Sequence, residues 1–154
     1  MKLPIPILLL GALLAPLTAQ APAGFSYWSA AEIRKTAAGL AAKVNAQKLA
    51  AQDLARWGNH WASLTHREGD GEGELHETVA DIFIAQSGAA TLIVGGKLAG
   101  PHEVSKGEVR GKAIEGGARR SLAPGDIVHI PENTPHQLLV PKSFDYFVVK
   151  VAVK

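Results

Sequence analysis

Turn-forming residues recur at short intervals from Trp57 to the carboxyl terminus, and this spacing constrains the fold more than any other feature of the chain. Glycine, proline and small polar residues separate short β-branched and aromatic runs at 69–71, 87–88, 95–96, 116–117 and 124–125. Turns about eight to fifteen residues apart are typical of antiparallel sandwiches and barrels. We therefore predict an all-β domain over 57–154. Its strands are expected near 58–67, 73–77, 80–86, 90–94, 126–130, 136–140 and 144–152.

A helix is predicted ahead of this β-rich part. Ser29 is followed three positions later by Glu32, which is the pattern of a capping box at a helix start. Apolar residues then recur at near-helical spacing to about Ala42. The run 48–56 fits a helix by propensity and a strand by tertiary pairing, and the sequence leaves both open. We treat 20–56 as an amino-terminal helical and extended segment.

Residues 1–19 have the features of a secretory signal peptide. Lys2 gives a minimal positive start, an apolar stretch follows over 5–14, and small residues surround Ala19, after which we expect cleavage. Prolines such as Pro16 interrupt the apolar run, so we expect no stable membrane anchor. The chain is predicted to be exported to the periplasm or the cell exterior. It has no cysteine, so its stability must come from packing rather than from disulfides.

Charge and length narrow the class further. The formal net charge is +2, and acidic and basic residues are interspersed rather than gathered into a stripe. This pattern predicts no nucleic-acid partner. The roughly 135 residues that remain after the leader are enough for one domain with its own core.

Two segments about fifty residues apart carry the chemistry of the chain. The first runs over 74–88 and the second over 124–137. Because alternate side chains of a strand share a face, Glu74 and His76 are expected to project together in the first segment. In the second, a proline-stiffened turn precedes His136, which begins a returning strand with its ring directed inward. Imidazole and carboxylate groups directed at one interior point are ligands for a divalent metal.

The first segment resembles the first motif of the cupins. That motif has two histidines one residue apart, then a glutamate, then a glycine seven residues after the glutamate. Gly88 follows Asp81 by seven, so Asp81 takes the glutamate position, His76 the second histidine position and Glu74 the first. A shifted alignment makes His76 the first histidine and Thr78 the substitute for the second. Both alignments stay open.

The second segment resembles the second cupin motif. That motif runs glycine, five residues, proline, one residue, glycine, two residues and histidine. Gly125, Pro131, Asn133 and His136 occupy these positions, and asparagine tolerates the left-handed conformation that such a turn needs. Val140 stands where many cupins have an asparagine.

The resemblance implies a fold and a metal site. The implied fold is a double-stranded β-helix, the jelly-roll barrel of cupins, behind an amino-terminal helix and often assembled as a homodimer. The implied cofactor is one divalent transition metal (Fe, Mn, Ni, Zn or Cu). Its ligands would be His76, His136, Glu74 and Asp81. Asp81 is one methylene shorter than glutamate, so it either binds the metal directly or orients a ligating imidazole through a hydrogen bond.

Two further residues are candidates for catalysis. His60 lies on the strand before the first motif, and Lys150 lies in the middle of the last strand. A lysine facing the cavity could bind an anionic substrate or move a proton, whereas most such lysines lie on the surface. His66 precedes a glycine-rich turn, so we expect it to be exposed. The polar, glycine-rich stretch 97–120 is predicted to be an external excursion with a short hairpin over 109–114.

Two functions fit these observations. The first is an exported, metal-dependent cupin enzyme that acts on a small oxygenated or carbonyl-containing molecule, with lyase, isomerase or dioxygenase chemistry. The second is a non-catalytic periplasmic cupin that binds a sugar-like small molecule, which the departures from the first motif favour. A barrel that serves only dimerisation is a third reading, supported by the many small apolar residues.

Overall fold

The structure, a computed structural model, describes residues 20–153. The predicted signal peptide over 1–19 lies outside the described residues. One helix, α1 (Ala30–Ala41), precedes the strands of the described chain. The strands are β1 (Leu49–Trp57), β2 (His60–Arg67), β3 (Gly73–His76), β4 (Val79–Gly88), β5 (Ala90–Val94), β6 (Lys97–Ala99), β7 (His102–Ser105), β8 (Glu108–Gly111), β9 (Ala113–Glu115), β10 (Ala118–Leu122), β11 (Ile127–Ile130), β12 (His136–Leu139) and β13 (Phe144–Ala152).

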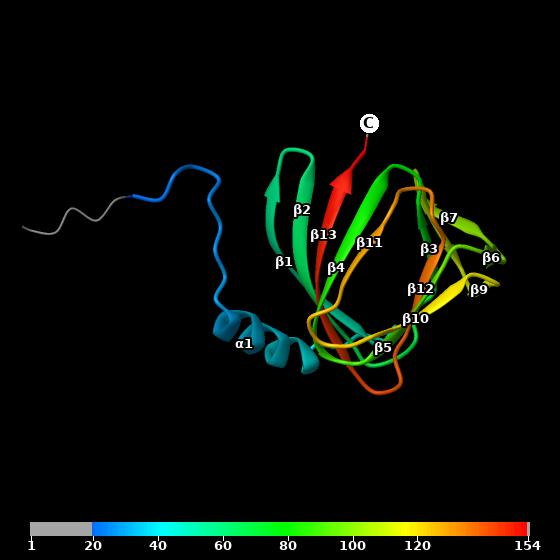
Figure 1. Cartoon of the computed structure of the whole chain (residues 1–154), viewed down its shortest axis with the longest axis horizontal. Coiled ribbons are helices and arrows are strands. Elements are labelled where there is room, and N and C mark those ends of the chain that lie inside the picture. The colour runs from blue at the N-terminus through cyan, green and yellow to red at the C-terminus, as the bar shows by residue number, and fades with distance from the viewer. Residues whose placement is uncertain (1–19, 154) are drawn as a thin grey trace, which may run out of the picture.

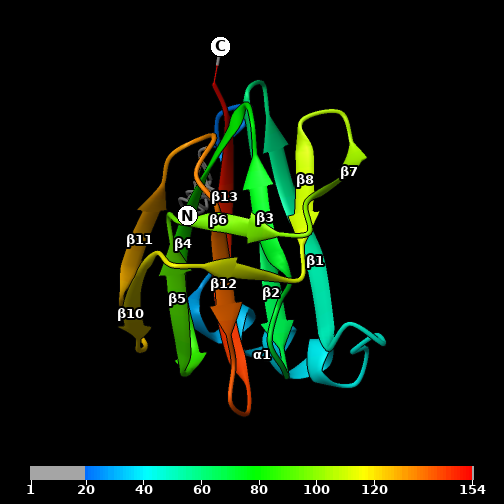
Figure 2. The ribbon, with the colours of Figure 1, turned by 90° about the vertical axis from the view of Figure 1, so that its right-hand side faces the viewer.

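The strands form two antiparallel sheets that face each other (Figure 1). The first has the order β1-β2-β13-β4-β11 and the second β10-β5-β12-β3-β8-β7. Figure 2 shows that the short pair β6-β9 runs across the strands of the second sheet. Neighbouring strands are mostly distant in the sequence, as in a jelly roll. The predicted all-β barrel with an amino-terminal helix is therefore confirmed.

Inward-facing side chains change from polar to apolar along the barrel. On β4 the inward positions are Asp81, Phe83 and Ala85, and on β13 Lys150 is followed towards the strand start by Val148. The apolar end is a continuous core. It contains Phe83, Ala85, Ala90, Leu92, Leu122, Ile130, Leu138, Val140, Phe144, Tyr146 and Val148. One end of the barrel is therefore filled, and the polar groups are left at the other.

The helix packs on the outer face of the first sheet. Both hydrogen bonds of the predicted capping box are present, because the Ser29 hydroxyl accepts from the Glu32 amide and the Glu32 carboxylate accepts from the Ser29 amide. Leu40 is buried against Leu64 and Ala50, which lie on the outer faces of β2 and β1. Burying this apolar stripe is what holds so short a helix in place.

Two boundaries differ from those predicted. The segment 48–56, for which the sequence allowed either a helix or a strand, forms β1. This strand pairs with β2 along its length, so the barrel begins at Leu49 rather than at 57. Pairing outweighs the helical propensity of its alanines and leucines. The stretch 97–120 is not an external loop with a hairpin over 109–114. It supplies β7 and β8, and β8 pairs with β3 inside the second sheet.

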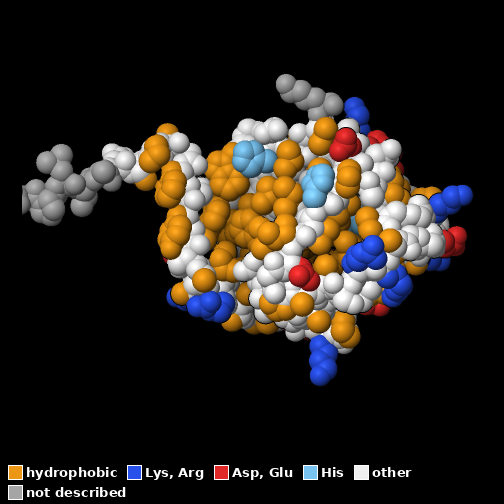
Figure 3. Space-filling model, viewed as in Figure 1, with side chains coloured by type: hydrophobic (Ala, Val, Ile, Leu, Met, Phe, Trp, Pro, Cys, Tyr) orange, Lys and Arg blue, Asp and Glu red, His pale blue; other side chains and the backbone are white. Residues whose placement is uncertain are grey.

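The outer face of the first sheet is strongly apolar. Figure 3 shows hydrophobic side chains gathered over this face, beside the amino-terminal segment. On β11, Ile127 is 70% exposed there. Among the described residues, no helix is long and apolar enough to cross a membrane.

Candidate metal centre

Strand pairing brings the two sequence motifs together. On the second sheet β12 lies beside β3, with His136 opposite Glu74. On the facing sheet β13 lies beside β4, with Lys150 opposite Asp81. The turn before β12 is also tied to β3, because the Asn133 amide donates to the carbonyl of His76 at 2.7 Å. Asn133 has φ +55°, the left-handed conformation expected from the motif.

Four side chains of this region have ligand atoms close together. One ligand atom each of Glu74, His76 and His136 lies within 4.8 Å of the others. Asp81 Oδ2 lies 3.3 Å from His76 Nε2 and 3.5 Å from His136 Nε2. Atoms that bind one ion at about 2.1 Å are themselves about 3.0–3.5 Å apart, so these spacings suit a shared cation. Glu74 lies on β3 within this group, whereas Thr78 lies beyond the end of that strand.

Hydrogen bonds behind both imidazoles fix which nitrogen faces the centre. His76 Nδ1 is 2.5 Å from Glu108 Oε2, and His136 Nδ1 is 3.0 Å from the carbonyl oxygen of Thr134. A carbonyl only accepts, so His136 Nδ1 carries the hydrogen and a neutral ring presents its Nε2 lone pair inward. This is the way that metal-ligating histidines are commonly oriented.

His136 Nε2 is buried and has no hydrogen-bond partner. Buried polar atoms are nearly always satisfied, and each exception needs a cause. An inward lone pair beside His76, Glu74 and Asp81 is explained if a cation belongs at this point. The donor set, two imidazoles and two carboxylates, suits Fe, Mn, Ni, Zn or Cu, and so the residues fit the implied metal.

Lys150 reaches into the same centre. Its Nζ lies 2.9 Å from His76 Nε2 and donates to Asp81 Oδ1 at 2.8 Å. The mid-strand lysine therefore faces the interior, and the commoner surface placement does not apply. Its ammonium shares two of the four candidate ligands and so competes with a metal for them.

Asp81 is the most deeply buried of the charged groups, with 2% of the residue exposed. Burial alone would raise its pKa, but the positive charge of Lys150, whose Nζ donates to Oδ1, holds the pKa of Asp81 well below its usual range. Asp81 is therefore a carboxylate whose Oδ2 faces both imidazoles and whose Oδ1 accepts from Lys150.

Three functional candidates were missed from the sequence. Glu108 and Arg110 lie on β8, in the stretch expected to be an external loop, and Arg67 lies at the end of β2. Alternation was the available signal. Glu108 and Arg110 share one face of a strand, and Arg67 shares the inward face of β2 with Ser63 and Thr65, which line the same cavity.

Two histidine predictions are corrected. His60 stacks on Trp57 with ring centroids 5.1 Å apart and lies on the outer face of β2, so it is not a catalytic candidate. His66 is buried rather than exposed. Both histidines have even numbers, and even-numbered residues of β2 point away from the barrel interior. His66 is nevertheless buried, because α1 covers the outer face of β2 near it.

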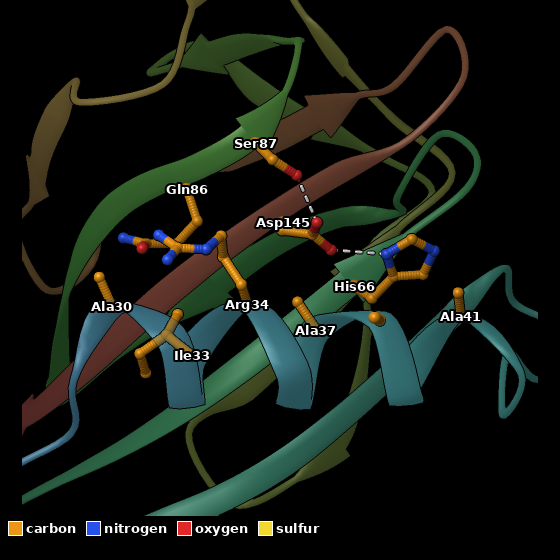
Figure 4. Close-up of a pocket in the computed structure, with 10 residues that line it drawn as sticks. Ala30, Ile33, Arg34, Ala37, Ala41, His66, Gln86, Ser87 and Asp145 are labelled. Carbon is orange, nitrogen blue, oxygen red and sulfur yellow. Dashed lines mark hydrogen bonds and ion pairs between the residues drawn. The ribbon is translucent and has the colours of Figure 1, made fainter.

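His66 belongs to a second, smaller polar cluster under α1 (Figure 4). Its Nδ1 is 2.6 Å from Asp145 Oδ1, its Nε2 is 3.2 Å from Glu68, and Asp145 also accepts from the Ser87 hydroxyl. Burial lowers the pKa of His66, but the hydrogen bonds and charges of Asp145 and Glu68 outweigh burial and raise the pKa above its usual value. The imidazolium therefore stabilises the pairing of β2 with β13 beneath α1.

We expect a His66→Gln variant to lose most stability under mildly acidic conditions. A histidine whose pKa is higher in the folded state contributes fully below its unfolded pKa of about 6.5, and this contribution is lost as the pH rises through the folded value. The difference in Tm between wild type and variant should therefore be larger at about pH 6 than at about pH 9. The exposed His102 offers the control, and an equal Tm difference at both pH values would contradict the assignment.

Comparison of the sequence with family models and with curated proteins finds no match. Comparison with solved structures does. KdgF from Halomonas sp. superposes with a TM-score of 0.51 at 15% identity, covering 70% of this chain and 82% of that chain. An RmlC-like cupin from Shewanella frigidimarina gives 0.51 at 14%, covering 70% and 79%. A cupin superfamily protein from Desulfitobacterium hafniense gives 0.50 at 13%, covering 75% and 88%.

At this level of identity the likeness concerns the fold. It agrees with the two facing antiparallel sheets and with the way in which both sequence motifs meet at one end of the barrel. The chain therefore has the cupin fold.

Proposed function

We propose that the protein is an exported, metal-dependent cupin enzyme that acts on a small oxygenated or carbonyl-containing molecule. The observation that carries this proposal is the buried, unpartnered Nε2 of His136, oriented from behind by Thr134 and facing His76. His76, His136 and Glu74 would hold the metal, with Asp81 as the fourth candidate. When bound, a divalent metal supplies Lewis acidity towards a substrate oxygen.

The chain's own residues supply the rest of the chemistry. Lys150 Nζ, already bonded to Asp81, can hold or deliver a proton at the substrate. With Asp81 rather than Glu74 as the carboxylate ligand, the Glu74 carboxylate, whose Oε2 lies 3.6 Å from His76 Nε2, can accept the substrate proton. Phe83 and Val148 contribute an apolar wall to the adjoining cavity. Proton transfer beside a polarised oxygen supports lyase or isomerase chemistry; an oxygenase would use the same ligands.

The alternative is a non-catalytic cupin that binds a sugar-like small molecule. One observation favours it: the Lys150 ammonium already bridges His76 and Asp81, and so satisfies part of the ligand set without a metal. In that case the positive charge of Lys150 takes the place of the metal ion, and the cavity serves only to bind the small molecule.

Metal content separates the two functions. The protein should be prepared without a histidine tag from metal-replete cells and analysed for Fe, Mn, Ni, Zn and Cu by plasma mass spectrometry. The enzyme proposal expects about one ion per chain, as in other single-site metalloproteins. Less than about a tenth of an ion, with no uptake on titration of the purified protein, would contradict it and favour the binding module.

Export and dimerisation are also part of the proposal. Export is supported by the leader-like pattern over 1–19. A homodimer would bury the apolar outer face that includes Ile127. The intact mass of protein recovered from the periplasm tests the first, and light scattering in solution tests the second.

A further inference from the structure

Arg67 is a buried cation without an acidic partner. Only 6% of the residue is exposed, its Nε has no hydrogen-bond partner, and within residues 20–153 it makes no salt bridge. An unpaired buried charge is costly, and arginine is almost never fully buried unless paired. Its Cζ lies 3.1 Å from the position of a Cβ added at Gly71, so Gly71 leaves the guanidinium its place.

The other cations of this region are paired. Lys150 bonds to Asp81 at 2.8 Å. Arg110 lies 3.7 Å from Glu74 and 3.5 Å from Glu108. Among the described residues at this end of the barrel, Arg67 is therefore the cation that has no acidic side chain within salt-bridge distance. A negatively charged group of a ligand would neutralise its charge.

Arg67 lines a cavity of about 210 Å³ that opens beside the candidate metal centre. Glu74, Asp81 and Lys150 contribute to the same wall, so the cavity and the candidate ligands adjoin. Hydroxyl groups of Ser63, Thr65 and Tyr146 also belong to its lining. Burial raises the pKa of Tyr146 to about 12, so its hydroxyl stays a neutral donor. Hydroxyl groups and the Arg67 guanidinium thus face one small space, together with the carboxylates of Glu74 and Asp81.

We propose that Arg67 binds the carboxylate of a small organic acid in this cavity, with the remainder of the ligand directed towards His76 and His136. The planar guanidinium of arginine matches a carboxylate with two parallel hydrogen bonds. The assignment rests on the proposed function, because it names the substrate class of the same site. The volume of the cavity suits a ligand of a few carbon atoms.

Lactate and its neutral counterpart lactamide provide a matched pair of probes. Titration calorimetry of the tag-free protein should show that lactate binds wild type at least ~10-fold more tightly than lactamide, as expected for charge-assisted hydrogen bonds. Arg67→Met should remove this preference. Arg120→Met, which changes an exposed arginine on β10, should retain it. Inorganic phosphate, a tetrahedral anion, is the third probe and tests whether the cavity binds anions other than planar carboxylates.

A measurement on wild type keeps the test independent of variant folding. The Nε–H signal of Arg67 should shift in a ¹⁵N NMR titration with lactate and stay in place with lactamide. An unmoved signal at about 50 mM lactate, equal lactate affinity in folded Arg67→Met, or binding of phosphate alone would overturn the proposal.

Titrations with and without bound metal separate this inference from the proposed function. Lactate that shifts the Arg67 signal in a protein that takes up no metal supports the acid-binding cavity and removes the enzyme proposal. Stoichiometric metal with no lactate response leaves the metal centre and removes the cavity assignment.

Discussion

Replacement of His136 by alanine is expected to weaken metal binding at least ~100-fold, since second-sphere changes alone cost 10–100-fold. Among the candidate metal ligands, His136 presents a buried nitrogen that lacks a hydrogen-bond partner in the described chain, and His76 supplies the only other imidazole of this group. Loss of this nitrogen leaves one imidazole and two carboxylates, of which Asp81 is already bonded to Lys150. Dialysed protein should be titrated with Zn²⁺ or Mn²⁺ against a competing chelator.

The matched control is His129→Ala, because His129 is an exposed histidine on β11 and should bind metal as wild type does. Circular dichroism and Tm establish that both variants fold. Unchanged affinity in a folded His136→Ala protein would show that the centre is not a metal site, whatever the identity of metal found in the preparation.

The Lys150→Met substitution should change stability and metal affinity in opposite directions. Without the ammonium, the Asp81 carboxylate is left buried and without its charge partner, and breaking a buried ion pair in this way costs about 3–5 kcal/mol. The same change removes the cation that competes for His76 Nε2 and Asp81, so metal affinity should rise at least ~10-fold. Bound metal should then restore much of the stability that the variant has lost.

Urea unfolding with chelator and with saturating Zn²⁺ measures both effects. Lys142→Met, at an exposed position between β12 and β13, is the control for loss of a lysine charge. A Lys150→Met protein with wild-type metal affinity would show that the ammonium does not compete with the ion. A protein with undiminished stability under chelator would show that the Asp81 pair contributes little.

The strands were predictable because their signals are local. Turn residues and period-2 alternation located β5 and β13 at the expected residues. The capping box located α1 for the same reason, since Ser29 and Glu32 bond within one turn. The excursion over 97–120 was not predictable, because its glycine-rich strands gain their stability from pairing with β3 and with each other.

The residues of the candidate site also differ in whether a local sequence pattern could predict them. Motif spacing by itself determined that His76 and His136 are the central residues, because each lies a fixed distance from a turn that its own neighbours specify, and the structure places their rings 5.2 Å apart. Only the tertiary structure decided which charges meet them. Lys150, Glu108 and Arg67 come from strands β13, β8 and β2, whose order across the two sheets is not written in any local pattern. Burial and pairing of charges depend on that order, and for this reason the electrostatics of the centre followed from the fold and not from the sequence.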